Sequence, residues 1–130
     1  MPADYLENKS NPYNDHEPVD SSAAAIAAQG LIRLGQFLGE EGDQYTKAGI
    51  TIAKSLFSEP YLSTDQNHHG LILHSIYHRP NGWDYVPDGS KIPNGESSMW
   101  GDYHARELAL YIGKLSQGEN YHFFDCAPRN

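Results

Sequence analysis

The stretch "DSSAAAIAAQGLIRLGQFLG", residues 20–39, decides the fold because it is the strongest helix signal in the chain. It opens with Asp20 and Ser21, either of which suits an N-cap, and continues through strong helix formers to Gly39, a typical helix stop. Small and apolar side chains occupy nearly every side of this helix, which lets neighbouring helices approach closely. We therefore predict a helix over 21–38 that is buried on more than one face.

Apolar residues at helical spacing predict two further helices. The link "GEEG" is short enough to make 21–38 and a helix over 43–57 an antiparallel hairpin. The apolar stripe of this second helix is Tyr45, Ala48, Gly49, Ile52, Ala53 and Leu56. The third helix begins between Ser98 and Trp100 and runs to Leu115. Its stripe is His104, Leu108, Tyr111, Ile112 and Leu115.

The remaining segments are irregular. Residues 63–95 are rich in turn signals around "LILHSIYH", a β-branched run that suits an extended segment. A connection of this length is unusual in a compact domain unless it has a function. We divide the chain into a lead-in over 1–19, a helical unit over 20–118 and an irregular tail over 119–130. The expected fold class is all-α, with three main helices and one long loop.

Three helices cannot cover a first helix that is apolar almost all round. We therefore expect this helix to pack against neighbours from outside the chain, which come either from a longer parent protein or from another subunit.

Composition excludes several classes of partner. The formal net charge is −8 over 130 residues and no Lys/Arg cluster offsets it, which argues against nucleic acid and against anionic membranes. No apolar run approaches the roughly 18 residues of a membrane span, and the first residues do not form a signal sequence. The single Cys126 suits a reducing compartment, so we expect a cytoplasmic protein, provided that no targeting segment precedes this sequence.

The long loop is the functional candidate because it gathers histidines and aromatic residues. His74 and His78 have the spacing of metal ligands on a helix, but they lie in an extended or turn-like segment without an HExxH or cysteine context. Solvent-exposed or hydrogen-bonded histidines are the simpler interpretation. The second interpretation is carbohydrate recognition, in which the flat faces of Trp83, Tyr85 or Trp100 stack on sugar rings. Tryptophans that cover a core are the alternative to it.

Charged and hydroxyl groups in the loop leave other readings open. Arg79 and Lys91 are the only cations in the loop, so an anionic ligand would use them or a neutral donor such as Tyr77. Ser97 and Ser98 lack a nucleophile elbow and suit a helix cap equally well. A carboxylate pair for glycoside hydrolysis would come from the loop and the start of the last helix, where spacing selects no pair among Asp65, Asp84, Asp88, Glu96 and Asp102. In the first helical turn, Asp102 also suits the helix dipole.

Three segments in order, "DSSAAAIAAQGLIRLG", "HHGLILHSIYHRPNG" and "GESSMWGDYHARELAL", resemble the C-terminal portion of glycoside hydrolase family 88, the unsaturated glucuronyl hydrolases. The similarity covers most of residues 5–116. It implies an (α/α) barrel of six helical hairpins, of which this chain supplies the last part. It also implies action on oligosaccharides that end in a 4,5-unsaturated uronic acid, in which an aspartate protonates the vinyl ether and water adds at C5. No metal or organic cofactor is implied.

The resemblance also places the substrate-binding residues. Tyr77 and His78 lie by the substrate pocket in the family pattern, and Ser97, Ser98 and Trp100 belong to the loop that faces the neighbouring sugar. With Arg79 as the adjacent cation, these residues form the predicted substrate-binding set. The catalytic aspartates of the family lie upstream of the matched portion, so no residue here inherits that role and we expect the chain alone to be inactive. The expected partners are an unsaturated uronyl oligosaccharide and either the N-terminal part of the barrel or another subunit. The alternative function is a non-catalytic helical module that buries its apolar faces in an oligomer.

Overall fold

The computed structural model describes residues 11–119 and 121, and these contain helices and irregular segments without a β-strand. The elements are α1 (Ser21–Leu38), the 3₁₀ turn η2 (Gly39–Gly42), α2 (Asp43–Leu56), the 3₁₀ turn η3 (Arg79–Asn81) and α3 (Met99–Ser116). The all-α prediction and its three helices are confirmed. Parts of the predicted lead-in and tail, together with Cys126, lie outside the described residues. No helix in the described ranges is long and apolar enough to cross a membrane.

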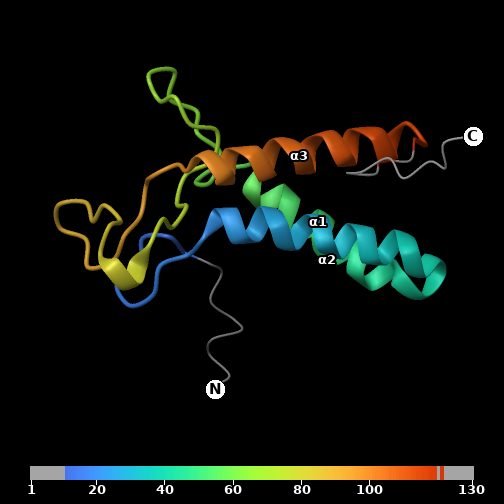
Figure 1. Cartoon of the computed structure of the whole chain (residues 1–130), viewed down its shortest axis with the longest axis horizontal. Coiled ribbons are helices and arrows are strands. Elements are labelled where there is room, and N and C mark those ends of the chain that lie inside the picture. Colours follow the sequence, from blue (N-terminus) through green and yellow to red (C-terminus); the bar gives the residue numbers. More distant parts are fainter. Residues whose placement is uncertain (1–10, 120, 122–130) are drawn as a thin grey trace, which may run out of the picture.

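Helix α1 is the central element because it contacts both other helices. α1 and α2 form the predicted antiparallel hairpin through η2, and α3 runs alongside α1 (Figure 1). The long loop gathers at the end where α1 and α3 begin. Two helix N-termini therefore lie beside the segment that carries the candidate site.

The ends of α1 follow the chemistry of its sequence. The N-cap is Asp20, whose carboxylate accepts a hydrogen bond from the Ser22 amide at 3.0 Å. Gly39 ends the helix with a φ of 62°, a left-handed conformation that glycine adopts without a steric cost. Of the two N-cap candidates, Asp20 therefore takes the role, and the predicted stop at Gly39 is confirmed.

Small residues let α1 and α2 approach closely. A Cβ atom on Gly49 would lie 2.6 Å from Ile32 Cγ1 and 2.8 Å from the Ala28 carbonyl oxygen, so glycine is required at this crossing. The core that results draws on all three helices and the loop. Its buried members are Ala25, Ala28, Ile32, Ala53, Leu56, Tyr61, Ile72, Ala105, Leu108 and Tyr111.

The expectation that α1 is buried on more than one face is wrong for the described part of the chain. Burial is confined to one face, because α2 and α3 both contact that side, and Ala23, Ala27 and Gly30 are exposed. Large apolar side chains share the open face with these small residues, and Phe37 is 86% exposed. The others on α1 are Ile26, Leu34 and Leu38. The helix is apolar on nearly every side, as predicted, but its open face packs against no element among the described residues.

The predicted extended segment is irregular, with one antiparallel bridge between Leu62 and Ile72. Its backbone donors therefore need acceptors from elsewhere in the chain, because an unpaired buried N–H costs free energy. The Asp102 carboxylate accepts the Leu71 and Ile72 amides at 2.9 and 3.0 Å. The Leu73 amide donates to the Tyr61 carbonyl at 2.7 Å.

Two more aspartates extend this pattern toward the site. Asp20 accepts the Ile76 amide at 3.3 Å, and Asp84 accepts the amides of Tyr77 and His78. Asp102 lies in the first turn of α3, as the dipole interpretation requires, but its carboxylate also accepts two loop amides. Ser98 is the N-cap of α3, with its hydroxyl accepting from the Gly101 amide at 3.0 Å, and Asp102 instead ties the loop to the helix.

The close crossing of α1 and α2 makes a testable prediction. Gly49→Ala should lower the free energy of unfolding by about 1 to 3 kcal/mol, because the new methyl group overlaps a backbone carbonyl that cannot move away. Gly113→Ala, at a helical position with nothing within 4 Å of the added Cβ, should raise it by about 0.5 to 1 kcal/mol. Urea denaturation followed by circular dichroism measures both. Equal effects of the two substitutions would contradict the packing described.

The link between Asp102 and the loop makes a second prediction. Asp102→Ala should destabilise the chain by about 1 to 3 kcal/mol, because it leaves the Leu71 and Ile72 amides without an acceptor. The control is Asp88→Ala, which removes an exposed loop carboxylate. Thermal unfolding and amide hydrogen exchange of residues 71 and 72 report the effect. If exchange at those two amides is unchanged in Asp102→Ala, the carboxylate does not hold them.

Candidate functional site

Two hollows meet at residues 96–99, directly before α3. We call the larger one, of about 700 Å³, the histidine pocket; it is lined by Asn67, His68, His69, Gly70, Tyr85, Pro87, Asn94, Gly95, Glu96, Ser97, Ser98, Met99 and Asp102. We call the smaller one, of about 360 Å³, the aromatic pocket; it is lined by Ser75, Tyr77, Trp83, Glu96, Ser97, Ser98, Met99 and Trp100. The segment that precedes α3 forms the wall between them.

Three aromatic rings stack at the aromatic pocket, with Tyr77 in the middle. Its ring centroid lies 5.7 Å from that of Trp83 and 5.3 Å from that of Trp100, with interplanar angles of 30° and 27°. Tyr77 is 55% exposed and Trp83 is 59% exposed, so the stack covers no core of the described chain. Exposed aromatic faces beside hydroxyl groups can stack on a sugar ring and bind its hydroxyls.

A short turn brings the two sides of this stack together. The η3 turn ends at Gly82, whose φ of 64° reverses the chain so that Trp83 returns to Tyr77. The carboxylate of Asp84 then accepts the amides of Tyr77 and His78, which closes the turn. Tyr77 and Trp83 are therefore placed by local hydrogen bonds, whereas Trp100 is placed by the first turn of α3.

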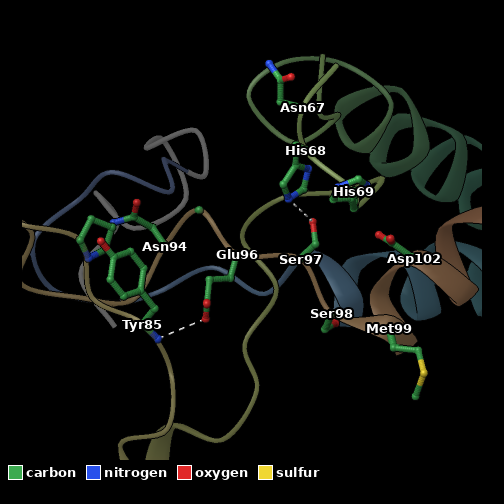
Figure 2. A pocket seen from close by; sticks show the side chains of 13 residues that line it. Asn67, His68, His69, Tyr85, Asn94, Glu96, Ser97, Ser98, Met99 and Asp102 are labelled. Carbon is green, nitrogen blue, oxygen red and sulfur yellow. Dashed lines mark hydrogen bonds between the residues drawn. The ribbon is translucent and has the colours of Figure 1, made fainter. Parts of the chain in front are cut away.

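In the histidine pocket, His68 lies between the hydroxyls of Ser63 and Ser97. Figure 2 shows its contact with Ser97. The Ser97 hydroxyl donates to the Ile72 carbonyl at 2.5 Å, so it acts as acceptor toward His68 Nε2, 3.4 Å away. The Ser63 hydroxyl, 2.9 Å from His68 Nδ1, is then the donor to that nitrogen. The histidine therefore does not take the Ser97 proton, which argues against Ser97 as an activated nucleophile.

The opposite side of the same pocket carries neutral polar groups and one carboxylate. Tyr85 and Asn94 lie across from His68, with Glu96 between the two sides (Figure 2). The Glu96 carboxylate accepts the Tyr85 amide at 3.2 Å.

Both loop cations are paired with acidic residues of the lead-in. Arg79 lies 2.6 Å from a Glu17 carboxylate oxygen, and Lys91 lies 2.8 Å from an Asp15 carboxylate oxygen. The hydrogen bond and charge of Lys91 lower the pKa of Asp15, and the same contact raises the pKa of Lys91. An anionic ligand would have to compete with these carboxylates for the two cations.

Four of the six predicted substrate-binding residues line one hollow. Tyr77, Ser97, Ser98 and Trp100 come together at the aromatic pocket. The Ser98 hydroxyl is engaged as the N-cap of α3. The other two predicted residues lie apart from this lining: the His78 ring packs at 4.9 Å from Trp83, and Arg79 binds Glu17. Their roles in substrate binding stay predictions.

The predicted set left out His68, Asn94 and Glu96, which the structure places beside Ser97 and Ser98. The loop approaches Ser97 at Gly70, where an added Cβ would overlap the Ser97 side chain. The spacing of His68 and Gly70 is too common in sequences to predict that the loop contacts Ser97 at this glycine.

The two chemical alternatives for the loop meet physical obstacles. His74 is buried with its ring nitrogens at the Gly95 amide and the Pro60 carbonyl, so it and the exposed His78 do not converge on a metal. Among the described residues, no group of three or more His, Cys, Asp or Glu side chains is placed to hold a metal ion. Four of the five candidate carboxylates accept backbone amides: Asp65, Asp84, Glu96 and Asp102.

Comparison with known proteins gives one consistent relationship. No protein-family model and no curated protein matches the chain. Among solved structures, an unsaturated glucuronyl hydrolase specific for heparin shares its fold, with a TM-score of 0.60 and 24% identity over 78% of this chain and 25% of the hydrolase. The unsaturated glucuronyl hydrolase of Bacillus sp. GL1, responsible for glycosaminoglycan degradation, has a TM-score of 0.60 and 27% identity over 79% of this chain and 26% of its own.

A third similar structure is an aspartate-to-asparagine variant of such a hydrolase together with the oligosaccharide dGlcA-Glc-Rha-Glc. Its TM-score is 0.59, with 27% identity over 79% of this chain and 26% of that one. The chain thus spans about a quarter of the length of these enzymes. The resemblance seen in the sequence is confirmed: this chain is similar to part of the unsaturated glucuronyl hydrolases, glycosidases with an (α/α) barrel fold.

Proposed function

We propose that this chain is the C-terminal portion of an unsaturated glucuronyl hydrolase and supplies one wall of its sugar site. The observation that carries the proposal is the stack of the exposed Trp83 and Tyr77 with the half-buried Trp100, beside Ser97. In this arrangement the sugar attached to the unsaturated uronic acid stacks on an aromatic face, and loop hydroxyls and amides bind its polar groups. The likeness to three such hydrolases supports the assignment.

The proposed reaction is hydration of a vinyl ether. A carboxylic acid donates a proton to the C4–C5 double bond of the unsaturated uronic acid, and water adds at C5. The resulting hemiketal opens and releases the neighbouring sugar. The acid has to hold a mobile proton, whereas Asp84, Glu96 and Asp102 accept backbone amides as carboxylates. We therefore place the catalytic acid on helices outside this chain.

Exposed apolar side chains support a packing partner for α1 and α3. Phe37 and its neighbours form one stripe on α1, and Met99, Tyr103 and Leu110 form another on α3. Apolar stripes of this kind are covered when helical hairpins pack side by side in an (α/α) barrel. The proposed partner is the rest of such a barrel, from the same protein or from another subunit.

The same stripes favour one alternative function, a non-catalytic helical module that assembles with copies of itself. In that case the chain forms a homo-oligomer and binds no unsaturated disaccharide. Light scattering together with a binding measurement separates the two functions. A stable monomer that shows no tendency to associate would argue against both.

The first prediction from the proposed function concerns activity. The 130-residue chain by itself should leave an unsaturated glucuronyl disaccharide intact, because the catalytic aspartates of the family it resembles lie upstream of the matched portion and four of its five candidate carboxylates hold backbone amides. The ultraviolet absorbance of the conjugated double bond reports the reaction. A loss of absorbance that depends on the concentration of this chain would overturn the placement of the acid outside it.

The second prediction concerns binding at the aromatic pocket. Trp83→Ala should weaken binding of an unsaturated glucuronyl disaccharide by about 0.5 to 1.5 kcal/mol, because a stacking face is lost. Tyr77→Phe, which keeps the ring, should weaken it less than Tyr77→Ala. The matched control is Phe37→Ala, which removes an exposed ring far along α1. Isothermal titration calorimetry measures all four variants, and equal affinities for Trp83→Ala and wild type would refute the stacking site.

A further inference from the structure

His74 connects three segments of the chain from a single buried position. It is 1% exposed, and its φ of 66° is unusual for a residue other than glycine. Its backbone carbonyl accepts the amide of Ser21 at 3.0 Å, at the start of α1. Its ring reaches the segments on either side of the loop, with Nδ1 at 2.9 Å from the Gly95 amide nitrogen and Nε2 at 3.2 Å from the Pro60 carbonyl oxygen.

The two ring partners determine the protonation state of His74. The Gly95 amide can only donate, so Nδ1 must carry a lone pair. The Pro60 carbonyl can only accept, so Nε2 must carry the proton. A protonated imidazole would turn the Nδ1–H toward the Gly95 N–H, and two donors cannot share a hydrogen bond. The geometry therefore accommodates only the neutral ring with its proton on Nε2.

The surroundings of the ring also disfavour its charged form. The rings of Tyr13 and Tyr61 meet it edge-on, at centroid distances of 5.2 and 5.7 Å. Burial lowers the pKa of His74 below its usual 6.5, and the hydrogen bond to the Pro60 carbonyl opposes this shift in part.

The ionisable side chains on the elements packed against His74 are the two tyrosines and Asp15, His16, Glu17, Asp20, Glu59 and Glu96. Both ring nitrogens of His74 contact backbone groups, so none of these side chains forms an ion pair with the ring. The Asp20 carboxylate accepts from Ser22 and Ile76, and the Glu59 carboxylate accepts from the Thr64 hydroxyl. The Glu96 carboxylate accepts the Tyr85 amide.

The segment that His74 holds is the wall between the two pockets. Gly95 has a φ of 90° and precedes Glu96, Ser97 and Ser98 directly. A second bond, from the Ser75 amide to the Glu96 carbonyl at 2.9 Å, ties the same segment to the residue after His74. A third bond, from the Ser97 hydroxyl to the Ile72 carbonyl, does not involve the His74 ring. Loss of the ring bond therefore frees the Gly95 amide, at the start of the segment.

We propose that His74 is a positioning residue: its neutral ring fixes the start of residues 95–98 at Gly95, and its protonation loosens this segment and weakens ligand binding at the aromatic pocket. The ligand part of this statement rests on the proposed function, whereas the release of the segment does not. The effect has a definite sign. The hold is complete above the ordinary pKa of histidine and is lost as the pH falls through the lowered pKa of the folded protein.

Nuclear magnetic resonance of the full 130-residue chain tests the release directly. Imidazole ¹⁵N shifts should show the Nε2–H tautomer of His74 at neutral pH. On acidification, the amide shifts of residues 95–98 should change with the midpoint of His74, which lies below the ordinary histidine pKa of 6.5. Amide shifts that follow the midpoint of His68 instead, which lies beside Ser97, would overturn the proposal. An Nδ1–H tautomer, or a ring that stays neutral until the whole chain unfolds, would also overturn it.

A substitution separates titration of His74 from other effects of acid. His74→Asn removes the titrating ring but keeps an acceptor near the Nδ1 position, and asparagine tolerates a positive φ. In this variant the amides of residues 95–98 should lose their pH-dependent step, whereas His16→Asn should retain it. A step that persists in folded His74→Asn refutes the assignment. If the variant does not fold, coincidence of the midpoints in the wild-type titration still decides.

Measuring disaccharide binding as a function of pH distinguishes failure of this inference from failure of the proposed function. The dissociation constant of an unsaturated glucuronyl disaccharide should increase at least threefold as His74 is protonated, and it should be constant over the same range in His74→Asn. Binding that is unaffected by protonation of His74 overturns the positioning role. Absence of binding at every pH refutes the sugar site and the ligand part of the inference, while the amide titration continues to test the release.

Discussion

The structure depends on how the backbone amides of residues 71–78 find acceptors. This segment runs from the core to the site with one isolated bridge and no sheet around it. Buried or half-buried amides need partners, and carboxylates are the strongest acceptors available. Asp102 on α3, Asp20 at the start of α1 and Asp84 in the loop supply them. The loop is therefore attached to the two helix N-termini that surround it.

This use of aspartates also shapes what the site can do. The carboxylate oxygens that accept backbone amides are engaged in holding the loop. These hydrogen bonds fix the loop backbone, and with it the positions of the rings and hydroxyls that the loop carries. Tyr77 lies between two tryptophans, and Ser97 lines both pockets. This display of rings and hydroxyls suits the role that we propose, one wall of the sugar site in a larger glycosidase.

The helices were predictable because their signals are local. Asp20 and Gly39 mark the ends of α1, and the spacing of Gly49, Ala53 and Leu56 marks the buried face of α2. The candidate site was predictable only in part. Tyr77 and Trp100 meet as expected of a common site, but Arg79 turns to Glu17, and His68 joins Ser97 through the approach at Gly70. Contacts between distant segments leave no periodic pattern in a sequence.

The sequence by itself determined the three helices, the all-α class and the resemblance to unsaturated glucuronyl hydrolases, because caps, apolar spacing and motif order are properties of neighbouring residues. Only the tertiary structure decided the roles of the loop's polar side chains. Asp102 suited the helix dipole from its position, and it holds two loop amides. For His74 the simpler expectation was an exposed or hydrogen-bonded histidine, and only the fold shows that its ring joins Pro60 to Gly95. A carboxylate or an imidazole binds whichever donor or acceptor folding brings to it, and that partner lies far away in the chain.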